Sequence, residues 1–335
     1  MDADSVDQVG PVAHGSDPES DGIDFSANVN PETPEGVEQV YRSALEDARA
    51  YPPRGYPRFR RAGADYIGVE PEAVVPTAGG LAAIRLALST TVDPGDRVLV
   101  PTPSFGEYAR EVRLQGGDPV FVPVEDVLDA DPSAVALVIL CNPNNPTGEA
   151  LDGGALRSFV ERSRAAGTPV LVDEAFLGFT EEPTLAGTPG TIVARSLTKL
   201  FGLPGLRAGF AVANGDHLER LEAARMTWNL DVPAAATGAH VMQDRAFVGR
   251  TRERVARERA QLRSTLAERY GIHDSEAPFL LLRVEGSVTD LVDRARERGI
   301  VLRDARTFRG LDSHVRVAVR RPSENRRLEE VLLDG

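Results

Sequence analysis

The chain has 335 residues, of which 41% are hydrophobic and 27% are charged, so it can bury a large core without disulfide or metal staples. Its formal net charge of −13 argues against nucleic acid as the main partner, because phosphate binding needs a basic surface. No apolar run approaches the roughly 20 residues needed to cross a bilayer, so we expect no membrane partner.

The chain begins with a polar segment. Residues 1–22 are rich in Asp, Ser and Gly and predict a loose N-terminal arm. This segment lacks the basic start and the apolar stretch of a signal peptide. The single cysteine, Cys141, cannot form an internal disulfide. Together these features predict a cytoplasmic protein.

Short apolar segments then alternate with helical patterns. The sequence predicts strands at residues 97–101, 119–123, 134–141, 169–173, 191–196 and 208–213, and helices at residues 81–88 and 154–166. The segment 134–141 is apolar throughout, as expected for a strand covered on both faces. This alternation predicts an α/β fold with a doubly wound, mostly parallel sheet. Ligands of such sheets bind beyond the carboxyl ends of the strands.

The last third of the chain has a different pattern. Residues 241–270 predict one long helix, whose Arg and Glu residues at three- and four-residue spacing are typical of a solvated face. A strand at 279–284, a helix at 288–298 and a strand at 315–319 follow. This shorter pattern predicts a second, smaller α+β domain at the C-terminus.

The run SLTKLFGLPGLR, residues 196–207, is the strongest local feature. Lys199, the only lysine of the chain, lies next to leucine and phenylalanine, which would partly desolvate its amine and lower the pKa. Such a lysine can form a Schiff base with a carbonyl compound or with pyridoxal phosphate. Ser196 and Arg207 flank it with groups suited to a phosphate. Taken alone, the run also fits a surface lysine beside a Gly-Pro turn.

Three other segments lie at element ends where ligands bind. NPNNPTG (142–148) and DEAF (173–176) each follow a predicted strand, and TAGGL (77–81) opens a helix whose free N–H groups can bind an anion. Each segment alone is also typical of an ordinary turn or helix cap. The histidines show no metal-ligand spacing, so we expect no metal.

In this order and spacing, NPNNPTG, DEAF and SLTKLFGLPGLRAGF resemble the fold type I, aspartate-aminotransferase-like enzymes that use pyridoxal 5′-phosphate. The resemblance extends from Asp24 to about Pro322. It implies four parts of the chain: a flexible arm (1–22), a segment packed on the small domain (23–47), a large cofactor-binding domain (48–235) and a small C-terminal domain (236–335).

The resemblance also implies a role for each matching residue. Lys199 would bind the cofactor covalently and later move a proton, Asp173 would pair with the pyridine nitrogen, and Asn145 would bond the phenolic oxygen. The remaining cofactor contacts would be Ser196, Arg207 and the backbone near Gly80 and Leu81 at the phosphate, Phe105 stacked on the ring, and Tyr51 at the phosphate of the neighbouring subunit. The last contact implies a homodimer with a shared active site.

One residue departs from the family pattern. Most aminotransferases of this fold have tyrosine where this chain has Phe176, and that phenol normally helps to hold the ring oxygen. Without this phenol, hydrogen bonding to the ring oxygen would depend more on Asn145. The departure also weakens the prediction of a plain aminotransferase.

Two branches of the family are most similar, histidinol-phosphate aminotransferase and the threonine-phosphate decarboxylase of cobalamin synthesis. HG (14–15), IDFSANVNP (23–31), DEAF, VLRD (301–304) and HVRVAVR (314–320) resemble the second branch. This implies decarboxylation of O-phospho-L-threonine to (R)-1-amino-2-propanol phosphate, with the aminotransferase as the alternative. His14, Arg303 and Arg316 would bind the small phosphorylated substrate. A binding module without catalysis is disfavoured, because the residues that would hold the cofactor are present.

The cations have an unusual composition, since every one except Lys199 is an arginine. An acidic chain almost free of lysine is typical of a salt-adapted, halophilic protein. It is also typical of a GC-rich genome that favours arginine, alanine and aspartate codons. The sequence leaves both interpretations open.

Overall fold

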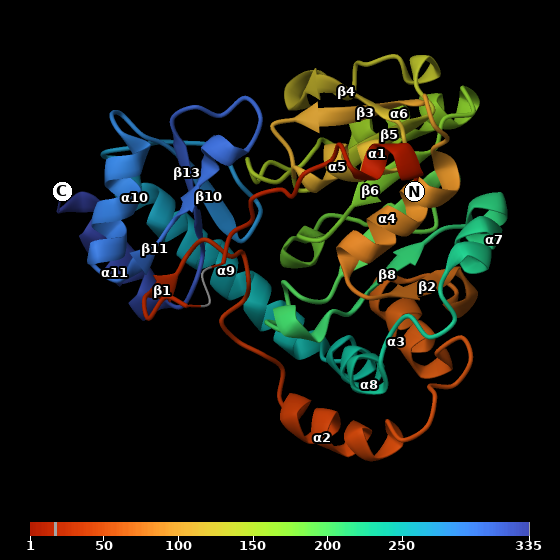
Figure 1. Ribbon diagram of the computed structural model, residues 1–335. Coiled ribbons are helices and arrows are strands. Elements are labelled where there is room, and N and C mark those ends of the chain that lie inside the picture. Colours follow the sequence, from red (N-terminus) through yellow and green to blue (C-terminus); the bar gives the residue numbers. More distant parts are fainter. Residues whose placement is uncertain (17–18, 335) are drawn as a thin grey trace.

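A seven-stranded sheet forms the centre of the larger part of the computed structural model, which describes residues 1–16 and 19–334 (Figure 1). In spatial order its strands are β2 (Val74–Thr77), β8 (Gly209–Val212), β7 (Thr191–Ser196), β6 (Val170–Asp173), β5 (Leu137–Cys141), β3 (Arg97–Thr102) and β4 (Asp118–Pro123). β8 runs antiparallel to both of its neighbours, whereas the remaining pairs are parallel. The predicted α/β fold with a mostly parallel sheet is confirmed.

Helices cover both faces of this sheet because its central strands are apolar on both sides. Ile139 of β5 belongs to the same buried cluster as Leu88, and the next residue, Leu140, belongs to a second cluster with Phe159. The helices that contribute to the first cluster are α4 (Gly80–Thr91), α5 (Glu107–Leu114) and α7 (Gly215–Ala224), and those of the second include α3 (Pro57–Ile67), α6 (Gly153–Ala165) and α8 (Val232–Val241). Alternate residues of one strand therefore serve two cores.

The strand ends bring the predicted motifs to one edge of the sheet. β3, β5, β6 and β7 run parallel, so the segments that follow Thr102, Cys141, Asp173 and Ser196 all leave at the same edge. Because β8 runs the opposite way, its first residue pairs with both Ser196 and the last residue of β2. Arg207, two residues before β8, therefore lies at the same edge as the other motifs.

A four-stranded antiparallel sheet forms the smaller part, in the order β12 (Arg303–Asp304), β13 (His314–Ala318), β10 (Phe279–Arg283) and β9 (Gly271–Ile272). The helices α10 (Val288–Glu297) and α11 (Pro322–Leu333) belong to the same part. β1 (Ile23–Asp24) pairs with β11 (Ile300–Val301), so the chain after the arm lies against this part. The following helix, α2 (Val37–Asp47), packs against α8 in the larger part.

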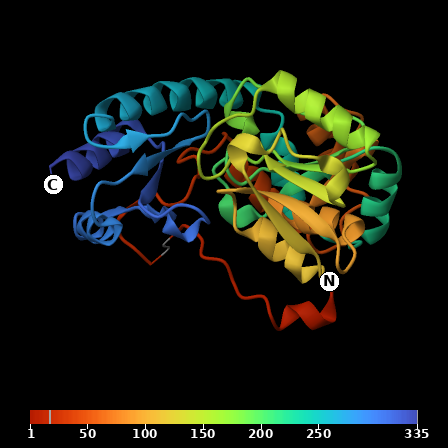
Figure 2. The same cartoon turned by 90° about the horizontal axis from the view of Figure 1, so that it is seen from above.

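Besides the chain between β1 and α2, two other described segments pass between the larger and smaller parts. Figure 2 shows α9 (Arg245–Leu266) running from one to the other, and the N-terminal arm crossing between them on the opposite side. The arm contains a short helix, α1 (Ala3–Val6), which packs near α5. The predicted division at residues 235 and 236 falls within α8. Among the described residues, no helix is long and apolar enough to span a bilayer.

The single helix predicted over residues 241–270 is wrong at both ends. α8 ends at Val241 and α9 begins only at Arg245. The break is stabilised by Asp244, whose carboxylate accepts a hydrogen bond of 2.8 Å from the backbone nitrogen of Phe247 and caps α9. The predicted strand at 134–141 is shorter too, because residues 132–134 form a turn of 3-10 helix.

Candidate active site

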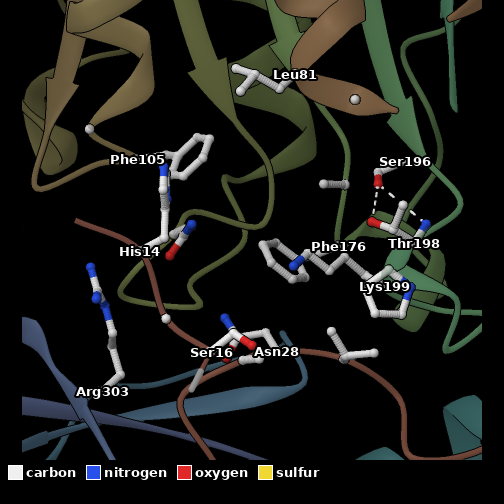
Figure 3. Close-up of a pocket in the computed structure, with 18 of the residues that line it drawn as sticks. His14, Ser16, Asn28, Leu81, Phe105, Phe176, Ser196, Thr198, Lys199 and Arg303 are labelled. Carbon is white, nitrogen blue, oxygen red and sulfur yellow. Dashed lines mark hydrogen bonds between the residues drawn. The ribbon is translucent and has the colours of Figure 1, made fainter. Parts of the chain in front are cut away.

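A cavity of about 430 Å³ lies between the strand ends of the large sheet and the smaller part of the chain. Most of the site residues predicted from the sequence line it: His14, Gly80, Leu81, Phe105, Asn145, Asp173, Ser196, Lys199, Arg207, Arg303 and Arg316. Figure 3 shows His14 and Phe105 together on one side of the cavity, and Ser196 and Thr198 on another. The structure therefore gathers side chains that are up to about 300 positions apart in the sequence.

Tyr51 is the predicted residue that does not line the cavity. Its side chain is 76% exposed and stacks on Trp228, with ring centroids 4.1 Å apart. Met226 and Trp228 are also exposed on the adjacent segment. Tyr51 makes no contribution to the site of its own chain, so its predicted contact needs a second subunit.

Lys199 lies in the loop after β7 and projects into the cavity. Its backbone oxygen accepts a hydrogen bond of 3.0 Å from Asn30, which ties the loop to the segment after β1. Burial lowers the pKa of Lys199 to about 8, and the positive charges of Arg316 and Arg207 act in the same direction. The amine is therefore partly neutral near neutral pH, as a nucleophile requires.

Asp173, the last residue of β6, has both carboxylate oxygens held by hydrogen bonds. Tyr108 Oη donates to Oδ2 at 2.7 Å, and the backbone nitrogen of Ala175 donates to Oδ1 at 3.0 Å. Burial raises the pKa of Asp173, while these two bonds and the charge of Lys199 oppose the rise. A buried carboxylate that faces the cavity is suited to a cationic ring nitrogen.

A set of anion-binding groups lies where α4 begins. The N-terminal turn of α4 offers free N–H groups at Gly80 and Leu81, and Ser196 Oγ lies 2.7 Å from Thr198 Oγ1 beside it. Gly79 has a φ of +89°, and a Cβ at this position would lie 2.7 Å from Nη2 of Arg207. The guanidinium can approach the helix N-terminus this closely only because Gly79 has no side chain. These groups suit a phosphate.

Two buried arginines form the opposite wall of the cavity. Arg303 and Arg316 occupy paired positions on β12 and β13, and burial lowers the pKa of both. Among the described residues, no carboxylate forms an ion pair with either guanidinium, and the buried Nε of Arg303 has no hydrogen-bond partner. Buried cations without a counter-ion favour an anionic ligand.

Arg316 also orients Asn145. Nη1 of Arg316 donates to Oδ1 of Asn145 at 2.5 Å, and Nη2 donates to the backbone oxygen of Ser26 at 3.2 Å. Because the amide oxygen of Asn145 is occupied, its NH₂ group is the part free to act in the cavity, and this group is a hydrogen-bond donor.

The arm supplies one wall of the cavity from the same chain. His14 Nε2 lies 2.8 Å from Oε1 of Glu107, and its ring centroid lies 5.7 Å from that of Phe105. The backbone oxygen of Ala13 accepts a hydrogen bond of 2.7 Å from Arg303. The segment at 12–16 is therefore held by both parts of the chain.

Sequence reasoning missed several residues at or behind the site. Ser16, Asn28 and Thr198 line the cavity, and Tyr108 lies behind Asp173. Thr198 lies between the predicted ligands Ser196 and Lys199, so its position was a usable signal. Asn28 lies within the motif IDFSANVNP, next to no predicted ligand. Tyr108 is one helical turn from Phe105, but nothing local connects it with Asp173.

The donors fit pyridoxal phosphate, the cofactor that the resemblance implies. A desolvated amine, a carboxylate, an amide donor and an aromatic ring lie around one cavity. Because Arg207 lies close to Gly79, its guanidinium and the N–H groups at the start of α4 can donate to the same phosphate. Phe176 also lines the cavity and packs edge-on against Phe279, with centroids 5.1 Å apart. No hydroxyl therefore comes from this position to the ring oxygen.

Comparison with known proteins agrees with this geometry. Residues 20–332 match the family described as "Aminotransferase class I and II". A protein of Caldanaerobacter subterraneus subsp. tengcongensis, named provisionally as a threonine-phosphate decarboxylase, is 32% identical over 91% of this chain and 88% of its own. Histidinol-phosphate aminotransferase 2 of Archaeoglobus fulgidus is 31% identical over 94% of this chain and 93% of its own.

A solved structure shows the same architecture. The crystal structure of L-threonine-O-3-phosphate decarboxylase from Porphyromonas gingivalis superposes with a TM-score of 0.84 at 28% identity. The match covers 92% of this chain and 97% of that one. Relatives with two different activities are thus similarly distant from this chain.

Proposed function

This chain belongs to the aminotransferase class I and II family, and we propose that it decarboxylates O-phospho-L-threonine to (R)-1-amino-2-propanol phosphate. It is a pyridoxal-phosphate-dependent enzyme, as the family is. The observation that carries decarboxylation over amino transfer is Phe176 at the cavity, where most aminotransferases of the fold have a phenol. The buried guanidiniums of Arg303 and Arg316, which have no carboxylate partner among the described residues, support a phosphorylated substrate. As the resemblance implies, the reaction would serve cobalamin synthesis.

We assign the cofactor contacts by the donors on each wall. Lys199 would form the covalent bond, Asp173 would pair with the ring nitrogen, and Asn145 would donate to the phenolic oxygen. Phe105 would pack against the ring. The phosphate would be held at the N-terminus of α4, by Gly80 and Leu81, together with Ser196 and Arg207. The positions of these groups around one cavity support the assignment.

When bound, the cofactor accepts the electron pair left on the substrate Cα after one of its bonds breaks. The chain determines which bond that is. Arg303, Arg316 and His14 bind the anionic groups of the substrate, and a grip on the side-chain phosphate leaves the carboxylate as the group presented for cleavage. CO₂ then leaves, and Nζ of Lys199 supplies a proton to Cα.

The second candidate is a histidinol-phosphate aminotransferase. It is supported by the relative from Archaeoglobus fulgidus and by the same arginines, which suit the phosphate of that substrate equally well. It requires Lys199 to remove the proton from Cα instead of donating one. Phe176 favours the decarboxylase, because most aminotransferases of the fold have a phenol there.

One assay separates the two candidates. The protein loaded with pyridoxal phosphate is incubated with O-phospho-L-threonine, and the released CO₂ and the amino-alcohol phosphate are quantified. We expect stoichiometric release of both, and none with K199A. Absence of CO₂, with transfer of the amino group from glutamate to imidazole-acetol phosphate, would instead establish the aminotransferase.

We further propose that the active unit is a cytoplasmic homodimer in which Tyr51 reaches the partner's site. The exposed Tyr51–Trp228 stack and the exposed Met226 next to it support this interface. Sedimentation of wild type should give about twice the mass of one chain, and W228A should shift the equilibrium toward the single chain. A monomeric wild type with full activity would contradict the proposal.

A further inference from the structure

Tyr108 lies behind the cavity and touches two of the residues that line it. Its side chain is completely buried on α5 and is not among the cavity-lining residues. Its Oη donates to Oδ2 of Asp173 at 2.7 Å. Its ring meets the ring of Phe105 edge-on, with centroids 5.5 Å apart and planes at 85°. One buried residue therefore supports both the carboxylate and the aromatic face of the site.

The hydrogen bond restricts what Asp173 can do. Ala175 holds Oδ1, so the bond from Tyr108 to Oδ2 leaves the carboxylate no freedom to rotate. A phenol that donates also favours the ionised form of its acceptor over the protonated form. Burial raises the pKa of Tyr108 well above its ordinary value, so the phenol keeps the proton it donates.

Loss of this donor would change the carboxyl group in a definite way. Desolvation would then act on Asp173 with only the Ala175 bond and the charge of Lys199 to oppose it. A larger fraction would be protonated, and a protonated carboxyl group cannot form an ion pair with a cationic nitrogen. The effect should appear as weaker preference for a ligand that carries such a nitrogen.

We propose that Tyr108 is a positioning residue that keeps the Asp173 carboxylate aimed into the cavity as the anionic partner of the cofactor's ring nitrogen. The inference rests on the role of Asp173 proposed above and is independent of whether the reaction is decarboxylation or amino transfer. Its test therefore uses binding and needs no substrate.

The test compares pyridoxal phosphate with 1-deazapyridoxal phosphate, in which carbon replaces the ring nitrogen. Dissociation constants for the apo-protein are measured by titration, and the ratio of the two constants isolates the contribution of the nitrogen. The Schiff base, the phosphate contacts and the folded fraction of the sample affect both ligands and cancel in the ratio. We expect Y108F to lower the preference for pyridoxal phosphate about tenfold, as for loss of one hydrogen bond to a charged group.

Y270F is the matched control. Tyr270 is also buried and donates its hydroxyl to the backbone oxygen of Leu332 at 3.0 Å, but it lies in the smaller part, away from the cavity. Y270F should keep the wild-type ratio. D173N should abolish the preference, and 4-aminophenylalanine at position 108, which retains a donor, should restore it. Rescue by this residue also serves if Y108F folds poorly.

The outcomes separate the two assignments. A wild-type ratio in Y108F, together with a lost preference in D173N, would overturn the inference and leave the role of Asp173 intact. A wild-type ratio in both variants would overturn the role of Asp173, and the inference with it. A reduced ratio in Y108F that 4-aminophenylalanine does not restore would show that the ring's packing, and not its hydroxyl, is responsible, and would also overturn the inference.

Discussion

Single residues of this site act through their surroundings. Lys199 is the only lysine of the chain, and the charges that act on its amine are those of the cations Arg316 and Arg207 and of the anion Asp173. Burial and the two arginines together disfavour its protonated form. The same composition makes Lys199 accessible to a direct chemical test, because no other lysine can be labelled.

We predict that Lys199 in the apo-protein reacts with acetic anhydride as an amine with a pKa of about 8. Below that pH the amine is protonated and unreactive, and above it the rate should level off, whereas a solvated lysine would continue to gain reactivity to a pH of about 10.5. Peptide mass mapping measures the rate at this site and separates it from the terminal amine. A midpoint near pH 10 would contradict the burial of the amine.

The same shift predicts how the stability of the apo-protein depends on pH. The pKa of Lys199 is lower in the folded chain than in the unfolded chain, so between about pH 8 and 10.5 the unfolded chain binds more protons. This contribution to the free energy of unfolding therefore increases as the pH rises through that window. Chemical denaturation of wild type and K199A at several pH values measures it, and equal slopes would contradict it.

At the scale of elements, the N-terminal arm is held at the cavity by contacts with both parts of the chain. Val12 packs directly on Gly106, because a Cβ added to Gly106 would lie only 2.8 Å from Cγ1 of Val12. His14 contacts Glu107 in α5, and Arg303 holds the backbone of Ala13. An element that contacts both parts and lines the cavity should influence substrate binding more than cofactor binding.

We predict that removal of residues 1–15 raises the KM for the phosphorylated substrate about tenfold or more, because it deletes His14 and frees Arg303 from Ala13. The dissociation constant for pyridoxal phosphate should change less than about twofold. Removal of residues 1–9 alone, which deletes α1 but keeps the segment at the cavity, is the control. An unchanged KM after removal of residues 1–15 would contradict the prediction. An equally raised KM in both truncated proteins would assign the effect to α1 and not to the segment at the cavity.

At the scale of the whole molecule, net charge is the dominant property. A charge of −13 produces self-repulsion in the compact state, and salt screens it. The screening length falls from about 10 Å at 0.1 M salt to about 3 Å at 1 M. This effect follows from the net charge and is expected for either interpretation of the lysine-poor composition.

We predict that raising KCl from 0.1 to 1 M increases the Tm by several degrees, since about 1 kcal/mol corresponds to about 2–4 °C in a chain of this size. Differential scanning fluorimetry measures the shift. A variant in which the exposed residues Glu46, Glu125 and Glu181 become glutamine should respond less. A Tm that does not change with salt would show that charge self-repulsion does not limit the stability of the folded chain.

Much of the fold and of the site could be predicted from the sequence because the relevant signals are local. The apolar strand before Asn142 indicates a two-faced sheet, and the order of the motifs along the chain identifies the family. In a parallel sheet, residues that follow strands must meet at one edge. That rule placed the segments of Asn145, Asp173 and Lys199 at one edge, and the family resemblance then identified these three residues within them.

Only the tertiary structure determined how these groups are paired. Tyr108 donates to Asp173 from 65 positions away, Arg316 donates to Asn145 from 171 positions away, and Tyr51 lies outside the cavity of its own chain. Hydrophobic periodicity states which face of an element is buried but not which side chain it meets. Those contacts depend on how layers far apart in sequence pack against one another, and no local pattern contains that information.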